Sequence, residues 1–189
     1  MKKLTLILAL TLIPILSFGQ SIFDKFENEQ EVTSIVLNQK MFSMLSKLNL
    51  DVDDPEAQQY IETVKKITGL KVFTTGNDKI AEEMNSAVNS YLKTSTLEEL
   101  MRIKDGGQTV KFYVKEGSDE NHVKELLMFI NGLKELTADQ DITINGKKRE
   151  VETVLLSLTG DIDLRQISKI TSSMNIPGGE HLEKASKKN

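Results

Sequence analysis

The sequence predicts an α+β fold, a largely antiparallel sheet with three to four helices packed mainly on one face. Three observations favour this class. Stretches of strand and helix character alternate over residues 31–93, and extended runs joined by glycine turns follow over 97–158. Such runs are typical of antiparallel hairpins. The apolar run Val154–Leu158 then leads into a stretch with apolar residues at helical spacing, which reaches Met174.

The first 19 residues have the composition of a secretory signal peptide. The basic pair Lys2-Lys3 precedes an apolar run over 4–16, and small residues follow where signal peptidase reads the chain. We expect cleavage between Gly19 and Gln20 and a periplasmic or secreted protein without a transmembrane anchor after cleavage. The apolar run is short for a membrane span, which needs about 20 residues. An uncleaved N-terminal anchor is the alternative.

The composition of the remaining chain excludes several classes of function. Residues 20–189 are enough for one α+β domain, with a loose C-terminal tail from about 183. Removal of Lys2 and Lys3 lowers the formal net charge from −4 to −6. An acidic chain without a basic cluster argues against nucleic acid as a partner. The chain has no cysteine, which excludes disulfides, thiol catalysis and cysteine-based metal sites.

The first elements after the signal peptide are a polar lead-in, a strand and a helix. We expect Phe23 and Phe26 to pin the lead-in over 21–30 to the domain. The β-branched stretch 31–37 predicts the first strand. Residues 39–48 fit a short helix with one apolar face, and methionines at such positions are typical of a core. The residues of this face are Met41, Phe42, Met44, Leu45 and Leu48.

A second helix is predicted from Pro55 to about Ile67. It is preceded by Asp51, Asp53 and Asp54. These carboxylates favour a helix cap, since proline fits the first helical position. A calcium loop needs further spaced oxygen ligands and a glycine, which are absent here. The side chains expected to face inward are Ala57, Tyr60, Ile61 and Val64.

Gly69 is expected to end that helix, with a strand over 70–75 and a turn and cap over 76–78. A long helix should follow over 78–93. Its apolar residues at helical spacing are Ile80, Met84, Ala87, Val88, Tyr91 and Leu92.

The middle of the chain reads as strands. Residues 97–104 and 122–130 fit either a strand or a helix, but the hairpin turn at 105–107 favours strands. Over 110–114 apolar and polar residues alternate, which predicts a half-exposed strand. Val110, Phe112 and Val114 are expected on the core side. The opposite side, with Lys111, Tyr113 and Lys115, is expected to be wet or to receive a partner.

The last predicted hairpin joins 142–144 to 149–158 through a turn at 145–148. A turn at Thr159-Gly160-Asp161 should then begin the final helix. Residues 71–92 show a similar order of strand, Thr-Gly, cap and helix. Local capping preferences or a degenerate duplication both explain this likeness. Neither copy has the glycines or the Gly-Lys-Ser/Thr ending of a phosphate loop.

No residue pattern predicts catalysis, a cofactor or a metal. His122 and His181 are the two histidines, and we expect both to be exposed and solvated. Zinc-protease and nucleophile-elbow motifs are absent. The tandem acids are expected to serve helix caps and dipoles, although a glycosidase-like pair is the alternative. These acids are Glu82 with Glu83, Glu98 with Glu99, and Asp161 with Asp163.

Several stretches together resemble a family of small exported bacterial proteins classed as a domain of unknown function, four-two-five-two. They include EELMRIKDGG at 98–107, VKFYVKE at 110–116, ELLM at 125–128, MNIPGGEHL at 174–182 and, most specifically, LLSLTGDIDLRQISKI at 155–170. The resemblance implies an envelope or secreted protein of Gram-negative bacteria. It also implies gene neighbourhoods with extracytoplasmic-function sigma factors, which suits envelope signalling. The family offers no established catalytic residues to carry over.

The expected function is therefore a non-enzymatic binding or interaction module in envelope-associated signalling or maintenance, with an envelope protein as partner. One alternative is a hydrolase of envelope polymers that uses a carboxylate pair such as Asp161 and Asp163. That alternative requires two carboxylates converging in a cleft. The other alternative is an oligomeric structural protein of the envelope.

Overall fold

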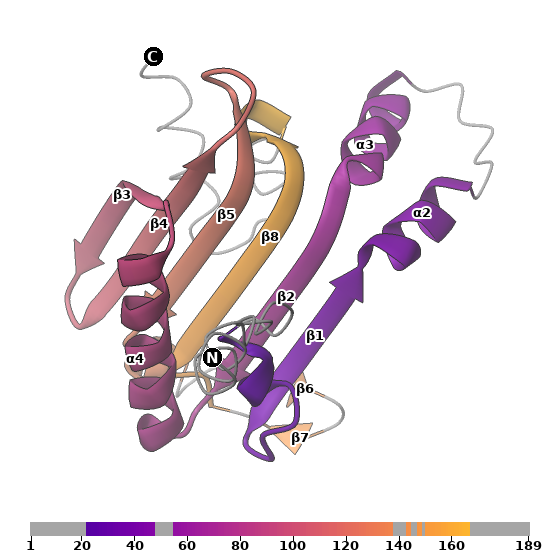
Figure 1. Ribbon diagram of the computed structural model, residues 1–189. Coiled ribbons are helices and arrows are strands. Elements are labelled where there is room, and N and C mark those ends of the chain that lie inside the picture. The colour runs from indigo at the N-terminus through magenta and orange to yellow at the C-terminus, as the bar shows by residue number, and fades with distance from the viewer. Residues whose placement is uncertain (1–21, 48–54, 138–142, 145–146, 149, 167–189) are drawn as a thin grey trace, which may run out of the picture.

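The computed structural model describes residues 22–47, 55–137, 143–144, 147–148 and 150–166. They are organised around a six-stranded sheet in which every neighbouring pair is antiparallel. Across the sheet the strands are β1 (Val32–Asn38), β2 (Ile67–Thr75), β8 (Thr153–Asp163), β5 (His122–Asn131), β4 (Gln108–Glu116) and β3 (Glu98–Asp105) (Figure 1). The α+β class predicted from the sequence is confirmed.

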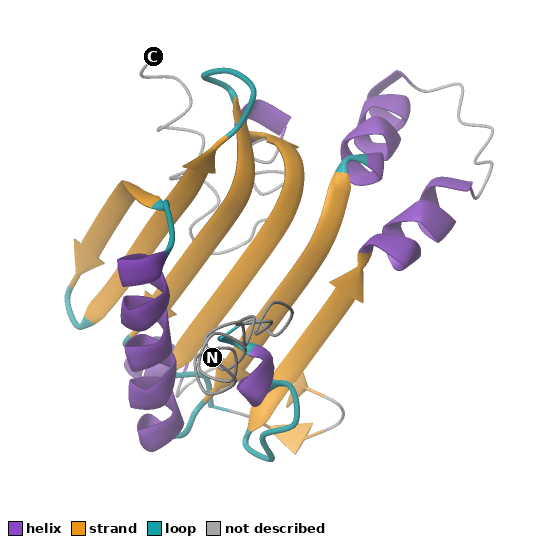
Figure 2. Cartoon of the chain, viewed as in Figure 1, coloured by secondary structure: helices purple, strands orange, loops and turns teal. Residues whose placement is uncertain are grey.

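Figure 2 shows the helices around this sheet, and the three longest occupy two positions relative to it. The described helices are the 3-10 helix η1 (Asp24–Phe26), α2 (Gln39–Lys47), α3 (Pro55–Lys65), α4 (Asp78–Thr94) and α5 (Lys134–Thr137). α4 links β2 to β3, which is an edge strand on the far side of β8, β5 and β4. Figure 1 shows α4 lying over the sheet, whereas α2 and α3 continue beyond the ends of β1 and β2.

One face of the sheet forms a core with α4 and the N-terminal segment. Phe23 and Phe26 are only 1% and 2% exposed, which confirms that they anchor this segment. The ring of Phe26 lies 6.0 Å from that of Phe73 on β2, and the ring of Phe23 lies 5.2 Å from that of Tyr91. The buried members of this core are Phe23, Phe26, Phe73, Ile80, Met84, Ala87, Val88, Tyr113, Leu127, Phe129 and Leu155.

α4 begins and packs as its sequence predicts. The Asn77 side-chain oxygen accepts hydrogen bonds from the backbone N–H groups of Lys79 (3.0 Å) and Ile80 (3.2 Å). These bonds satisfy donors that have no partner within the helix. The predicted apolar stripe faces the sheet, where Met84 is fully buried.

The opposite face of the sheet is also apolar. Val110, Phe112 and Val114 of β4 lie in a second cluster, together with Phe42 of α2. Tyr113 points to the other side and is buried in the core with α4. The expectation of a wet surface on this side of β4 is therefore wrong at Tyr113, whereas Lys115 on the same side is exposed. A tyrosine ring can be buried when its hydroxyl finds polar partners, and this one interacts with Glu99 and Arg102.

The apolar face predicted for α2 is only partly correct. Phe42 is 6% exposed, but Met41, Met44 and Leu45 are 42%, 59% and 40% exposed. The physical reason is position, because α2 continues beyond the end of β1 and has little sheet to cover. The expectation that its methionines fill the core is wrong. α3 matches its predicted start, and its Val64 packs against the second cluster.

Two predicted breaks are in fact continuous strand. Residues 159–161 belong to β8, and Gly69 lies inside β2. A Cβ atom on Gly160, whose φ is +145°, would lie 2.3 Å from the carbonyl oxygen of Lys66. One on Gly69 would lie 2.9 Å from the Thr159 hydroxyl. These glycines allow β2 and β8 to approach at a register shift. The turn predicted at 159–161 is therefore wrong: β8 continues to Asp163, and helical residues begin at Leu164.

The ambiguous stretches in the middle of the chain are strands. Residues 97–104 correspond to β3 and residues 122–130 to β5. Among the described residues, the predicted hairpin at 145–148 corresponds to the short pair β6 (Thr143–Ile144) and β7 (Lys147–Lys148). Its second arm is not β8, which pairs with β2 and β5 instead.

Some expectations fall outside the described residues. They concern the signal peptide with its cleavage between Gly19 and Gln20, the acidic run 51–54, the helix from 167 to Met174, His181, and the tail from about 183.

Candidate functional site

The acidic pair considered for catalysis lies at the end of β8. Asp161 and Asp163 line one cavity of about 150 Å³. Asp161 forms an ion pair with Lys66 at 3.3 Å. Asp163 accepts hydrogen bonds from the Arg165 guanidinium and backbone N–H, and the guanidinium bond lowers the pKa of Asp163. Each carboxylate has its own cationic partner, and Asp163 also caps the turn that follows. The two carboxylates share a cavity, as the hydrolase hypothesis requires, but the ion pair of each with its own cation favours a structural role.

A second cavity, of about 460 Å³, lies beside the turn between β4 and β5 and has an acidic lining. Its His122 side chain is only 18% exposed, and Nδ1 lies 2.8 Å from a carboxylate oxygen of Asp119. The expectation of a solvated His122 is thus wrong. Its hydrogen bond lowers the pKa of Asp119. Glu98 and Glu99 line the same cavity. Within the described ranges, no group of three or more acidic or histidine side chains is placed to hold a metal.

A buried carboxylate lies under the C-terminal half of α4. Glu125 of β5 is 9% exposed, and the Tyr91 hydroxyl lies 3.0 Å from both of its carboxylate oxygens. Burial raises the pKa of Glu125, while the hydrogen bond from Tyr91 and the charge of Lys115 oppose that rise. Burial, reinforced by the carboxylate, raises the pKa of Tyr91 to about 12. We interpret this pair as a tie between α4 and the sheet.

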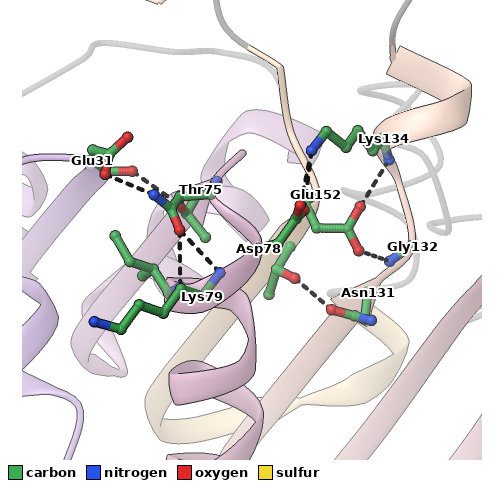
Figure 3. A network of polar contacts seen from close by, with 11 residues as sticks. Glu31, Thr75, Asp78, Lys79, Asn131, Gly132, Lys134 and Glu152 are labelled. Carbon is green, nitrogen blue, oxygen red and sulfur yellow. Dashed lines mark hydrogen bonds and ion pairs between the residues drawn. The ribbon is translucent and has the colours of Figure 1, made fainter.

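A polar network surrounds the N-terminus of α4, beside a cavity of about 700 Å³ (Figure 3). Lys134 forms an ion pair with Asp78 at 3.0 Å. The Glu152 carboxylate accepts hydrogen bonds from the backbone N–H groups of Gly132 and Lys134. Asn77 donates to Glu31 at 2.7 Å. These contacts join the segments at one end of the sheet, which is a structural role.

The remaining candidate is a group of exposed apolar residues on β1 and α2, which we call the β1–α2 strip. It consists of Ile35 and Val36, which are 50% and 44% exposed, and Met41, Met44 and Leu45 of α2. In the described part of the chain, the other exposed large hydrophobic residues are Ile22 and Leu100. Scattered exposed apolar residues are normal, whereas exposed apolar residues gathered in one region mark an interaction surface. These five lie within eleven residues of the chain, with Ile35 and Val36 on opposite faces of the sheet.

Sequence reasoning missed this strip because it assigned the methionine stripe to the core. One signal was nevertheless present: residues 32–38 contain no charged side chain, which is unusual for an edge strand. The glutamates Glu82 and Glu83, considered as an acidic pair, are exposed on α4.

These features describe an α+β protein with exposed apolar residues on β1 and α2. The chain belongs to the family described as Domain of unknown function (DUF4252), whose model matches residues 26–170. The resemblance inferred from the sequence is thereby confirmed. No solved structure matches the chain.

The chain is also similar to part of the membrane-associated protein TcaA of Staphylococcus epidermidis. The two are 37% identical over 73 residues, which cover 37% of this chain and 16% of that protein. The matched part is therefore a small fraction of the relative. Across the residues that the structure describes, no helix is both long and apolar enough to cross a membrane.

Proposed function

We propose that this protein is a non-enzymatic interaction module of the cell envelope, which binds a protein partner through the β1–α2 strip. The observation that carries this proposal is the exposure of five apolar side chains within residues 35–45. Leaving such side chains in water is unfavourable, and burying one against a partner is worth about 1.5–3 kcal/mol.

Two further features support a protein partner. β1 is the outer strand of the sheet, and an edge strand offers backbone hydrogen-bonding groups to an added strand. The exposed methionines of α2 have flexible side chains that adapt to a binding surface. The envelope location rests on the predicted signal peptide over residues 1–19. The partial likeness to a membrane-associated protein is in keeping with that location.

The test is affinity capture from the native periplasm with tagged protein that lacks residues 1–19. Wild type is expected to recover a reproducible protein partner. Met44→Glu places a charge on the most exposed apolar residue of the strip. In the complex the partner would bury Met44. Because the substitution removes this apolar contact and requires desolvation of a carboxylate, recovery should fall about tenfold or more. Quantitative mass spectrometry measures the recovered partner.

The matched control is Leu100→Glu, since Leu100 is 41% exposed and lies on β3 at the other edge of the sheet. This variant should recover as much partner as wild type does. Equal recovery by the Met44→Glu variant would contradict the proposal, as would capture of glycan fragments with no protein.

A further inference from the structure

The two edges of the sheet differ in how well they are protected from pairing. Edge strands usually avoid unwanted pairing through charges or bulges. β3 follows this rule, since its sequence EELMRIKD is rich in charge and its register shifts between Glu99 and Met101. β1 has the uncharged sequence VTSIVLN and pairs with β2 in continuous register. β1 therefore lacks the features that protect β3 from pairing.

β1 also exposes apolar side chains on both faces of the sheet. Alternate residues of a strand point to opposite faces, so the neighbours Ile35 and Val36 are exposed on different sides. An added strand beside β1 would shield both of them. A partner that covered only one face would leave the other residue in water.

We propose that the strand added to β1 is β1 of a second copy of this chain, antiparallel about a two-fold axis near Ile35. The charges around β1 fit such a pairing. The exposed Glu29 lies before the strand, as does Glu31, which also accepts a hydrogen bond from Asn77, and the exposed Lys40 lies after it. A two-fold axis brings the acidic start of one β1 beside the basic end of the other. Two parallel copies would instead bring like charges together.

This pairing has a specific geometric consequence. Ile35 is the central residue of β1, so it lies opposite Ile35 of the second copy. Val36 then lies opposite Ser34, a small exposed residue. The two sheets join into one continuous antiparallel sheet, in which both copies of β1 become internal strands.

The inference rests on the proposed function, because it names an occupant for part of the β1–α2 strip. Its test uses protein without residues 1–19, which retains every described residue. Light scattering coupled to size-exclusion chromatography measures the mass over a range of concentrations. Wild type is expected to shift from the mass of one chain to that of two as the concentration rises.

Cysteine cross-linking tests the geometry, since the native chain has no cysteine. Directly opposite residues in an antiparallel pair have Cα atoms about 4.5–5.5 Å apart, within the range of a disulfide. Ile35→Cys is therefore expected to give a covalent dimer on mild oxidation. Leu100→Cys, at a similarly exposed site on β3, should form no covalent dimer under the same oxidation. Circular dichroism checks that both variants are folded.

Two results would overturn the inference: a single-chain mass at every concentration, or a dimer in which Ile35→Cys does not cross-link. A monomer that nevertheless captures a different protein through Met44 would leave the proposed function standing. A cross-linked dimer that captures no other protein would support the second copy as occupant and count against a separate envelope partner.

Discussion

Replacing Phe73 with alanine is expected to lower the free energy of unfolding by about 3–5 kcal/mol. Phe73 of β2 is 1% exposed and packs against the N-terminal segment, with its ring 6.0 Å from that of Phe26. Its removal takes away buried apolar surface and leaves a cavity. A loss of this size is a large part of the free energy of unfolding of a typical domain, which is about 5–15 kcal/mol. Chemical denaturation measures it.

The control for this prediction is Met44→Ala. Met44 is 59% exposed, so its truncation should change stability by no more than about 0.5 kcal/mol. If Phe73→Ala were no more destabilising than Met44→Ala, the packing of residues 23–26 against β2 would be incorrect.

Replacing Tyr91 with phenylalanine is expected to cost about 1.5–3 kcal/mol at neutral pH, the usual value of a hydrogen bond to a charged group. The ring contact with Phe23 is preserved in this variant, while the hydroxyl that serves Glu125 is lost. Glu125 is 9% exposed. Its carboxylate would therefore be left buried without this donor.

The cost of Tyr91→Phe should depend on pH. The pKa of Glu125 is raised by burial above its ordinary value of 4.5, so the folded protein favours the protonated acid. The stability that protonated Glu125 contributes to the folded protein is fully present below pH 4.5. It is lost as the pH rises through the raised pKa of Glu125. Without Tyr91 the pKa of Glu125 should rise further. The stability gap between wild type and Tyr91→Phe should thus widen as the pH rises through the raised pKa of Glu125, above 4.5.

Urea denaturation across this pH range tests the prediction, with Glu125→Gln as control. Glutamine can still accept a hydrogen bond from Tyr91, but it does not ionise. On that background, Tyr91→Phe should have a small effect that does not vary with pH. A pH-independent gap in the wild-type background would show that Glu125 is not the group responsible.

The sequence predicted local structure well where short-range rules decide the outcome. Asn77 marks the start of α4 because its side chain satisfies free backbone donors at the helix terminus. Phe23 and Phe26 indicated an anchored segment, since two aromatic rings in a polar stretch need a place to be buried. Gly106, with φ of +53°, supports the predicted hairpin between β3 and β4.

The predictions failed where the outcome depends on distant neighbours. Gly160 resembles a turn residue, but it serves the close approach of β8 to residue Lys66. Tyr113 alternates with apolar residues as a surface residue would, yet α4 covers its face of the sheet. Met44 fits a core stripe, but α2 lies beyond the end of β1. The strip that we propose as the binding surface is a result of that last placement.

Amide hydrogen exchange on the complex of the protein with its captured partner tests most directly whether the β1–α2 strip is the binding surface. Compared with the single chain at low concentration, binding should slow exchange over residues 32–45, because added strand pairing protects outward N–H groups of β1 and burial protects α2. Exchange over β3 should not change. Slower exchange at β3 or beside the acidic cavity, with none over residues 32–45, would contradict the proposed binding surface.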